Sequence, residues 1–244
     1  MTFRNPLMFV AGSTSSEVTV PASSAFGTLA SETRLIWCRM DTAPSGSVSL
    51  LSQGGGGPSN VAASATAISI QRDYTTTDAR ADATFANVNI AVGRTFCVAS
   101  VLTNGVPALY GGGLGLPLTV ASAYSSGPTT GVGTLVDKSA NSVRIGGFSG
   151  VAQGWPGPIW FAAWFPFAMT VAELREAQFY PDKWKALAVA WWAVGAHGTS
   201  VVLDQSGNGH HGTMTGAVTS GAYPLTISQD IPLATSAALM VGVG

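Results

Sequence analysis

Short runs of apolar, β-branched and aromatic residues alternate along the chain with segments rich in glycine and proline. Such runs, bounded by turn-forming residues, are typical of β-strands. The runs that predict strands lie at 17–20, 33–40, 47–51, 67–71, 87–92, 95–101 and 142–145. The pattern therefore predicts an all-β protein.

One stretch has the pattern of a helix instead. Thr170 is followed three residues later by Glu173, and this spacing lets each side chain cap a free amide of the first helical turn. Pro181 ends the pattern, so the sequence predicts a helix over 170–179.

Glycine marks the turns. Asn104-Gly105 predicts a tight hairpin, because both residues readily adopt the positive φ angles that such a turn requires. Gly54 to Gly57, followed by Pro58, predicts a flexible loop.

Charged residues are scarce in this chain. Hydrophobic residues make up 46% of the 244 residues and charged residues only 9%, against about 25% charged in an average soluble domain. The segments 95–136 and 146–171 carry no charge at all. Because interface cores are poor in charge, we expect self-association, with a homotrimer favoured. An ordinary secreted domain rich in serine, threonine and glycine is the alternative.

Charge also excludes some partners. The formal net charge is -1 and no run of lysine or arginine is present, which excludes the electrostatic surface that nucleic-acid binding needs. The start of the chain lacks a basic segment followed by an apolar one, and no apolar run is long enough to span a membrane. We expect one core, no membrane segment and assembly in a cytoplasm. Cys38 and Cys97 lie in strand-like runs and predict buried free thiols, with a disulfide between neighbouring strands as the alternative.

The segment 204–213 reads Asp-Gln-Ser-Gly-Asn-Gly-His-His-Gly-Thr and follows the apolar stretch 188–194. Together they resemble the opening signature of laminin-G-like, concanavalin A-like jelly-roll modules, in which an aromatic strand precedes a D-x-S-G-N-x-x-H-G loop. Further segments resemble that family in the right order. They are 26–40 with Trp37, 48–52, 94–101 with 104–110, 142–147 with 157–164, and 167–176. The segment at 94–101 departs from the family because it lacks the tryptophan and histidine at its start.

The resemblance implies a jelly-roll β-sandwich with one short helix, and a binding or building module. The opening signature lies behind the closing helix, so the order of parts is changed. We expect residues 1–187 to form the sandwich. Residues 188–244 either complete it as a permuted first strand or form an arm between subunits, with 227–244 pairing with a sheet edge.

Candidate chemistry is sparse. Jelly rolls that hydrolyse glycosides need two facing carboxyl groups, which on a strand means acids at alternate positions. No predicted strand has them. Asp73, Asp78 and Asp82 lie in the polar segment 71–82 and are interpreted as solvated turn residues. We therefore expect no enzyme activity.

The histidines His210 and His211 beside Asp204 suggest a metal site, with calcium at Asp204 as the candidate and zinc as an alternative. The favoured interpretation is structural: Asp204 and Asn208 hydrogen-bond to the backbone and hold the loop, and one histidine packs locally. No other cofactor is expected.

Tryptophans are the best candidates for contact with a ligand or another subunit, because both surfaces favour exposed aromatic rings. Trp155 lies between Gly154 and Pro156 and is expected to be exposed. The candidate glycan-binding or interface residues are Trp155, Trp191 and Trp192. Trp160 and Trp164 are expected on one face of a strand, in the core.

The leading functional hypothesis is a bacteriophage virion protein, a capsid decoration protein on the particle surface that binds the major capsid protein or other virion proteins. The alternative is a glycan-binding module of a tail fibre or adhesin. Both rest on the fold resemblance and on the absence of catalytic acids.

Overall fold

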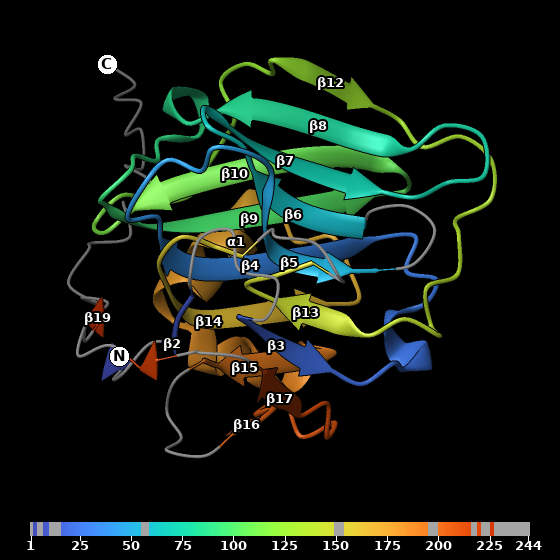
Figure 1. Cartoon of the computed structure of the whole chain (residues 1–244). Coiled ribbons are helices and arrows are strands. Elements are labelled where there is room, and N and C mark those ends of the chain that lie inside the picture. Colours follow the sequence, from blue (N-terminus) through green and yellow to red (C-terminus); the bar gives the residue numbers. More distant parts are fainter. Residues whose placement is uncertain are drawn as a thin grey trace, which may run out of the picture.

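The computed structural model describes residues 2–3, 7–9, 16–54, 59–148, 154–194, 200–215, 219–220 and 225–226. Two large antiparallel sheets stack face to face, and the helix lies behind one of them (Figure 1). The predicted all-β jelly-roll sandwich with one short helix is confirmed.

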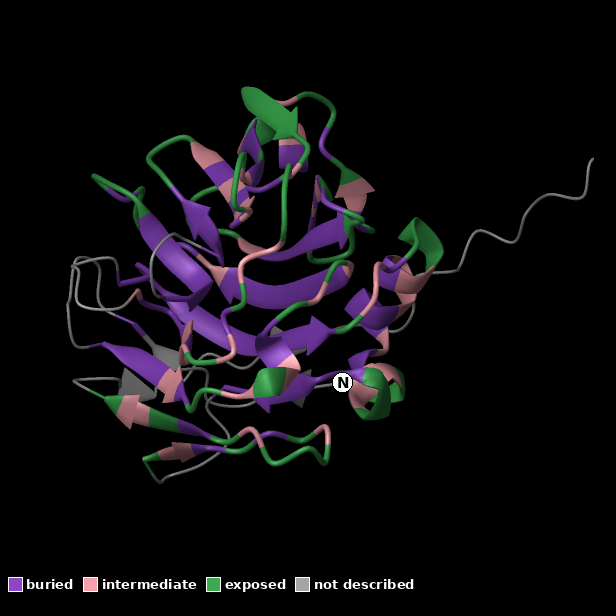
Figure 2. Ribbon diagram, turned by 90° about the vertical axis from the view of Figure 1, so that its right-hand side faces the viewer, coloured by how far each residue is buried: buried purple, intermediate pink, exposed green. Residues whose placement is uncertain are grey.

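The helix-bearing sheet has the strand order β11-β10-β9-β4-β14, and both β2 and β15 pair with the other edge of β14. Its strands are β2 (Leu7–Met8), β4 (Glu32–Arg39), β9 (Thr95–Thr103), β10 (Val106–Gly113), β11 (Thr119–Val120), β14 (Pro158–Phe165), β15 (Ala190–Ala193) and β18 (Thr219–Ser220), which pairs with β2. The single α-helix of the described residues, α1 (Val171–Phe179), covers the face of this sheet that points away from the second sheet (Figure 2).

The second sheet, here called the polar-faced sheet, has the order β12-β8-β7-β6-β5-β13-β3-β17-β16. Its strands are β3 (Glu17–Val20), β5 (Val48–Gln53), β6 (Ser59–Ala63), β7 (Ala67–Arg72), β8 (Ala79–Thr84), β12 (Ser126–Thr129), β13 (Val143–Ile145), β16 (Val201–Val202) and β17 (Gly212–Thr215). Apart from both sheets, β1 (Thr2–Phe3) pairs with β19 (Leu225–Thr226). Three short 3-10 helices are η1 (Ser24–Phe26), η2 (Ala86–Val88) and η3 (Pro181–Leu187).

The sandwich core follows from the strand register. Directly paired residues in an antiparallel sheet point to the same face. One such row crosses seven strands of the polar-faced sheet and is entirely apolar: Met214, Val18, Ile145, Leu51, Val61, Ile70 and Ala81. This row packs toward the helix-bearing sheet, so alternation of apolar and polar residues places the core between the sheets.

Most predicted elements appear where expected. Thr170 and Glu173 form the capping box that begins α1, and Asn104 (φ 48°) with Gly105 (φ 83°) forms the hairpin between β9 and β10. The predicted strand at 87–92 is wrong. Residues 86–88 form η2 instead, and Asn89 takes a left-handed conformation that ends it.

The predicted placement of Trp160 and Trp164 on one face of a strand is wrong. Trp160 and Trp164 are both buried but lie in different clusters, because a bulge between Ile159 and Phe161 shifts the alternation. Burial explains part of the scarcity of charge, because β9 and β14 lie in the two uncharged segments and are almost wholly buried.

Cys38 and Cys97 are buried free thiols, as predicted. They belong to different apolar clusters, on opposite faces of the helix-bearing sheet. Burial raises the pKa of both thiols well above the ordinary value.

Strands from the C-terminal segment join both sheets of the same chain. β15 pairs with β14, and β17 pairs with β3. The division of the chain at residue 187 stays a prediction, and residues 227–244, expected to form an arm, lie outside the described residues. Among the described residues, no helix is both long enough and apolar enough to cross a membrane.

Candidate functional site

The loop that carries the family resemblance is held by the carboxylate of Asp204. Its Oδ1 accepts hydrogen bonds from the amides of Trp191 and Ser206, each 2.9 Å long. Its Oδ2 accepts bonds of 2.9 Å from the Ser206 hydroxyl and from the amide of His210. Burial raises the pKa of Asp204, but these hydrogen bonds outweigh it and hold the pKa below the ordinary value.

The same loop clamps the start of β15. The amide of Asn208 donates to the carbonyl oxygens of Ala188 (2.9 Å) and Val189 (3.0 Å). The indole of Trp192 donates to the carbonyl of His210, whose ring lies 4.8 Å from that of Phe26. The structural interpretation of the loop is therefore confirmed.

No metal centre takes shape around this loop within the described part of the chain, where no three histidine, cysteine, aspartate or glutamate residues come together. His211 accepts the amide proton of Asp204 at Nδ1. Both carboxylate oxygens of Asp204 face N–H or O–H donors, an arrangement that suits a loop anchor. The calcium hypothesis stays a prediction without support from these contacts.

The three candidate tryptophans lie inside the molecule. Trp155, expected to be exposed, is fully buried and donates to the carbonyl of Arg39 at 3.0 Å. Trp191 stacks on Phe161 with ring centroids 5.4 Å apart, under α1, and Trp192 lies between the sheets. The expectation of exposure is wrong for Trp155, because the Gly-Trp-Pro segment turns its side chain into the core. Within this chain none of the three presents a ring to a ligand.

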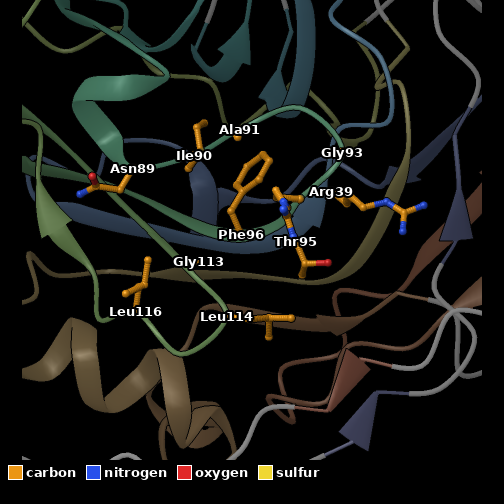
Figure 3. Close-up of a pocket in the computed structure, with 11 residues that line it drawn as sticks. Arg39, Asn89, Ile90, Ala91, Gly93, Thr95, Phe96, Gly113, Leu114 and Leu116 are labelled. Carbon is orange, nitrogen blue, oxygen red and sulfur yellow. The ribbon is translucent and has the colours of Figure 1, made fainter.

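A pocket of about 390 Å³ opens at one end of the helix-bearing sheet (Figure 3). It lies where β4 ends and β9 begins, and the loop after β10 forms its other wall. Figure 3 shows the Phe96 ring between the segment of Ile90 and Ala91 and the loop of Leu114 and Leu116. Sequence reasoning missed this pocket, because its walls come from segments that are far apart along the chain.

Two turns with similar geometry build the pocket walls. In the first, the Arg94 amide donates to the carbonyl of Ala91, and Gly93 at the third position has a φ of 76°. In the second, the Leu116 amide donates to the carbonyl of Gly113, and Gly115 has a φ of 75°. A positive φ at this position favours glycine. The two glycines thus fix the backbone positions of Arg94 and Leu116.

The second turn is also tied to α1. Gln178 donates to the carbonyl of Leu116 at 2.9 Å and accepts from the Leu118 amide at 2.7 Å. Arg175 donates to the carbonyl of Leu118 at 3.0 Å. The helix therefore fixes the pocket wall, and Leu116 remains 56% exposed at its rim.

The pocket is positively charged. Arg39 and Arg94 line it and no acidic residue does. Arg39 is paired with Asp41 through a contact of 2.5 Å, whereas Arg94 is exposed and has no ion pair among the described residues. Within the described residues, one positive charge of the pocket thus has no ion-pair partner.

A second surface is the outer face of the polar-faced sheet. Residues paired across it form a row of polar side chains, next to the apolar row of the core: Thr129, Arg80, Gln71, Asn60, Ser52, Arg144, Thr19 and Thr213. Asn60 and Ser52 in its middle are buried. Its charges are paired within the face, Arg80 with Asp82 and Arg144 with Glu17. Both arginines of this row are therefore ion-paired, whereas Arg94 at the pocket has no ion pair among the described residues.

A buried ionic cluster links the sheets at another end of the sandwich. Glu32 contacts Arg34 at 2.7 Å, and both Arg34 and Arg72 donate to the Ser59 hydroxyl at 2.7 and 2.6 Å. The Arg34 guanidinium lies 4.0 Å from the Trp164 ring centroid. Burial lowers the pKa of Arg34 to about 10, against the opposing effect of Glu32. These side chains are at most 1% exposed, so the cluster serves packing rather than ligand contact.

Every carboxyl group of the described residues has a partner. Seven meet a cation, Asp41, Asp73, Asp82, Asp182, Glu17, Glu32 and Glu176, and four accept hydrogen bonds, Asp78, Asp137, Asp204 and Glu173. Asp73 and Asp82 were expected to be solvated turn residues, and this is wrong: Asp73 is buried against Lys138, and Asp82 lies in β8.

Comparisons with known proteins identify the fold. No family model matches the sequence, and no curated protein matches it. The structure is similar to that of a candidate carbohydrate-binding protein from Bacteroides ovatus, with a TM-score of 0.61 and 14% identity. The match covers 92% of this chain and 62% of the other, so the chain spans less than two thirds of that protein.

Two further solved structures resemble this chain less closely. The sialidase module CBM40 of Ruminococcus gnavus, bound to sialyllactose, gives a TM-score of 0.49 at 16% identity over 69% of this chain and 96% of the module. A heptameric pentraxin from Limulus polyphemus gives 0.45 at 12% identity over 71% and 82% of the two chains. The likeness to the Bacteroides ovatus protein shows only the fold of this chain, a jelly-roll β-sandwich, and a phage origin is not shown.

Proposed function

We propose that this protein is a glycan-binding module and that the pocket beside Arg94 is its binding site. The observation that carries the proposal is the pocket itself, a concave site of about 390 Å³ whose lining combines apolar and polar groups. Its volume is near the lower end of ligand sites, which span about 300–1,000 Å³. A site of this size suits one or two sugar units.

The lining matches the two kinds of surface on a sugar. Exposed Leu114 and Leu116 offer an apolar surface for the C–H face of a ring, and the buried Phe96 also lines the pocket. Thr95 and the two arginines offer side-chain donors for hydroxyl oxygens. The likeness to a candidate carbohydrate-binding protein supports the same class of function by analogy of fold.

A binding role is favoured over hydrolysis. Glycoside hydrolysis needs two carboxyl groups that face each other about 5–9.5 Å apart across the bond. The pocket is lined by no carboxyl group, and each carboxyl group that the structure describes is already held by a partner. We propose no enzyme activity for this chain.

The capsid decoration hypothesis ranks second. One argument for it is the scarcity of charge, part of which is explained by the buried strands β9 and β14. The solved structures compared above are a candidate carbohydrate-binding protein, a sialidase module and a pentraxin, and none is described as a virion protein. Contacts with capsid proteins stay a prediction.

A glycan array followed by calorimetric titration tests the proposal. We expect the chain to bind at least one glycan class with a dissociation constant of about 1 mM or tighter, which corresponds to ~4 kcal/mol. Gly113→Val puts a side chain into the pocket without changing charge and should weaken this binding at least tenfold. A Cβ at Gly113 meets only Leu116 and Thr95, at 3.7 and 3.9 Å, so the strand accepts the change.

Gly46→Val is the matched control, since a Cβ there meets nothing within 4 Å and the site is remote from the pocket lining. Both variants should keep the far-UV spectrum and thermal midpoint of the parent. Absence of binding to any glycan, or equal binding by the folded Gly113→Val variant, would refute the proposal.

A further inference from the structure

The pocket carries a positive charge that no described residue neutralises through an ion pair. Arg94 is exposed, lines the pocket and has no ion pair within the described residues. The other cation in the lining, Arg39, already contacts Asp41 at 2.5 Å. The chain has only 11 lysines and arginines among 244 residues, so an arginine at a concave site without an ion pair among the described residues is an unusual feature of this chain.

The register brings the backbone segments that carry the two lining arginines together at one edge of the pocket. Arg39 is the last residue of β4 and pairs directly with Thr95 at the start of β9, and Arg94 precedes Thr95. Directly paired residues have Cβ atoms about 4.5–5.5 Å apart. Arg39 is neutralised by Asp41, so Arg94 supplies the positive charge at this edge with which an anionic group of a ligand would interact favourably.

The turn before β9 holds Arg94 in place before any ligand arrives. Its amide donates to the carbonyl of Ala91, and the amide of Gly93 donates to the carbonyl of Met40 at 2.7 Å. These bonds anchor the turn to the end of β4. A backbone that is already fixed loses less conformational entropy when its side chain engages a ligand.

We propose that this pocket binds a saccharide that bears a carboxylate, and that Arg94 engages the carboxylate. A guanidinium offers two parallel N–H donors that match the two oxygens of a carboxylate. Leu114 and Leu116 on the opposite wall contact the C–H face of the same sugar. The inference rests on the proposed glycan-binding function and adds the chemical class of its ligand.

The test compares acidic and neutral glycans on one array, and then titrates the best acidic ligand against its carboxyl-reduced form. The reduced form keeps every hydroxyl and loses only the charge. We expect the acidic form to bind at least tenfold more tightly, and its affinity to fall as salt is raised.

Three variants separate the role of Arg94 from a general effect of charge. Arg94→Gln should bring the acidic ligand down to the affinity of the reduced form. Arg94→Lys keeps the charge but loses the paired donors, and should fall between the parent and Arg94→Gln. Arg80→Gln, on the polar-faced sheet, removes the same charge outside the pocket lining and should leave binding unchanged.

The possible results distinguish the proposed ligand class from the proposed glycan-binding function. Equal binding of the acidic and reduced forms, with Arg94→Gln unaffected, overturns this inference and leaves the glycan-binding function intact. Displacement of the acidic sugar by sulfate or acetate at equal concentration also overturns it, since the pocket would then bind any small anion. Failure of every glycan to bind overturns the proposed function itself.

Discussion

At the scale of single residues, the Asp204 carboxylate is the clearest anchor, because it accepts three hydrogen bonds from its own loop and a fourth from the amide of Trp191 in β15. The residue types in this loop predicted that role, because aspartate and asparagine side chains commonly bond to nearby amides. Arg94 is the contrasting case. Nothing in the local sequence distinguishes it from other surface arginines, and its importance follows only from the pocket it lines.

We predict that Asp204→Asn destabilises the fold by about 2–4 kcal/mol, because an amide turns one acceptor into a donor that faces backbone N–H groups. Urea unfolding at neutral pH measures the change. Asp137→Asn is the control, since that carboxylate also accepts bonds from the next residues but is exposed. A loss at Asp204 no larger than that at Asp137 would contradict the prediction.

The same residue predicts a pH dependence. The pKa of Asp204 is lower in the folded chain than its ordinary value, so its ionised form stabilises the fold. This contribution is complete above the unfolded pKa of about 3.9 and is lost as the pH falls through the lower, folded value. The difference in unfolding free energy between the parent and Asp204→Asn should therefore be constant from pH 7 to 5 and shrink below about pH 4. A difference independent of pH would show that the charge has no role.

At the scale of elements, turns decide where the strands end and how the pocket is shaped. The hairpin between β9 and β10 was predictable from Asn104-Gly105 alone, since the two positive φ angles select those residues. The segment 87–92 was not, because its apolar residues have the spacing of a strand but are ordered by η2 and the Gly93 turn. Short apolar runs leave this ambiguity until tertiary contacts resolve it.

We predict that Gly105→Ala costs about 1–2 kcal/mol, because a residue with a Cβ is strained at a φ of 83°. The added Cβ would also lie 3.2 Å from the Tyr74 hydroxyl. Thermal or urea unfolding gives the value. The control is Gly46→Ala, where no atom lies within 4 Å of the new Cβ and the change should stay within about 0.5 kcal/mol. Similar effects of the two substitutions would argue against strain at the hairpin.

At the scale of the whole molecule, the sandwich is built from both ends of the chain. β3, near the start, pairs with β17 near the end, and β15 completes the edge of the helix-bearing sheet. Trp191 and Trp192 in β15 are buried on the two faces of that sheet. The C-terminal strands are therefore as central to the core as any others.

We predict that a chain ending at Leu187 does not fold cooperatively, because it lacks β15 to β17 and exposes the apolar surface they cover. A chain ending at Thr226 keeps every strand described here and should unfold in one transition. Circular dichroism during heating compares the two. An intact sharp transition in the shorter chain would instead make residues 188–244 a separate attachment.

The predicted self-association, with a homotrimer favoured, can be tested with the same Thr226 chain. If residues 227–244 join subunits, the full chain should elute as an oligomer at micromolar concentration and the shorter chain as a smaller species. Size-exclusion chromatography with light scattering gives both masses. A full chain that stays a monomer would exclude the predicted assembly at that concentration.

The sequence alone determined the class of fold. Alternation of apolar and polar residues, the capping box at Thr170 and the family-like order of segments are local patterns, and local patterns define strands, helix and turns. It also indicated that Asp204 holds its own loop, since the bonds from Ser206 and His210 are local, whereas the bonds between the loop and the start of β15 depend on tertiary structure. The tertiary structure decided which tryptophans are hidden, where a bulge reverses a face, and which arginine stands at a pocket. Those properties depend on contacts between distant segments, such as the pairing of Arg39 with Thr95, which no local pattern encodes.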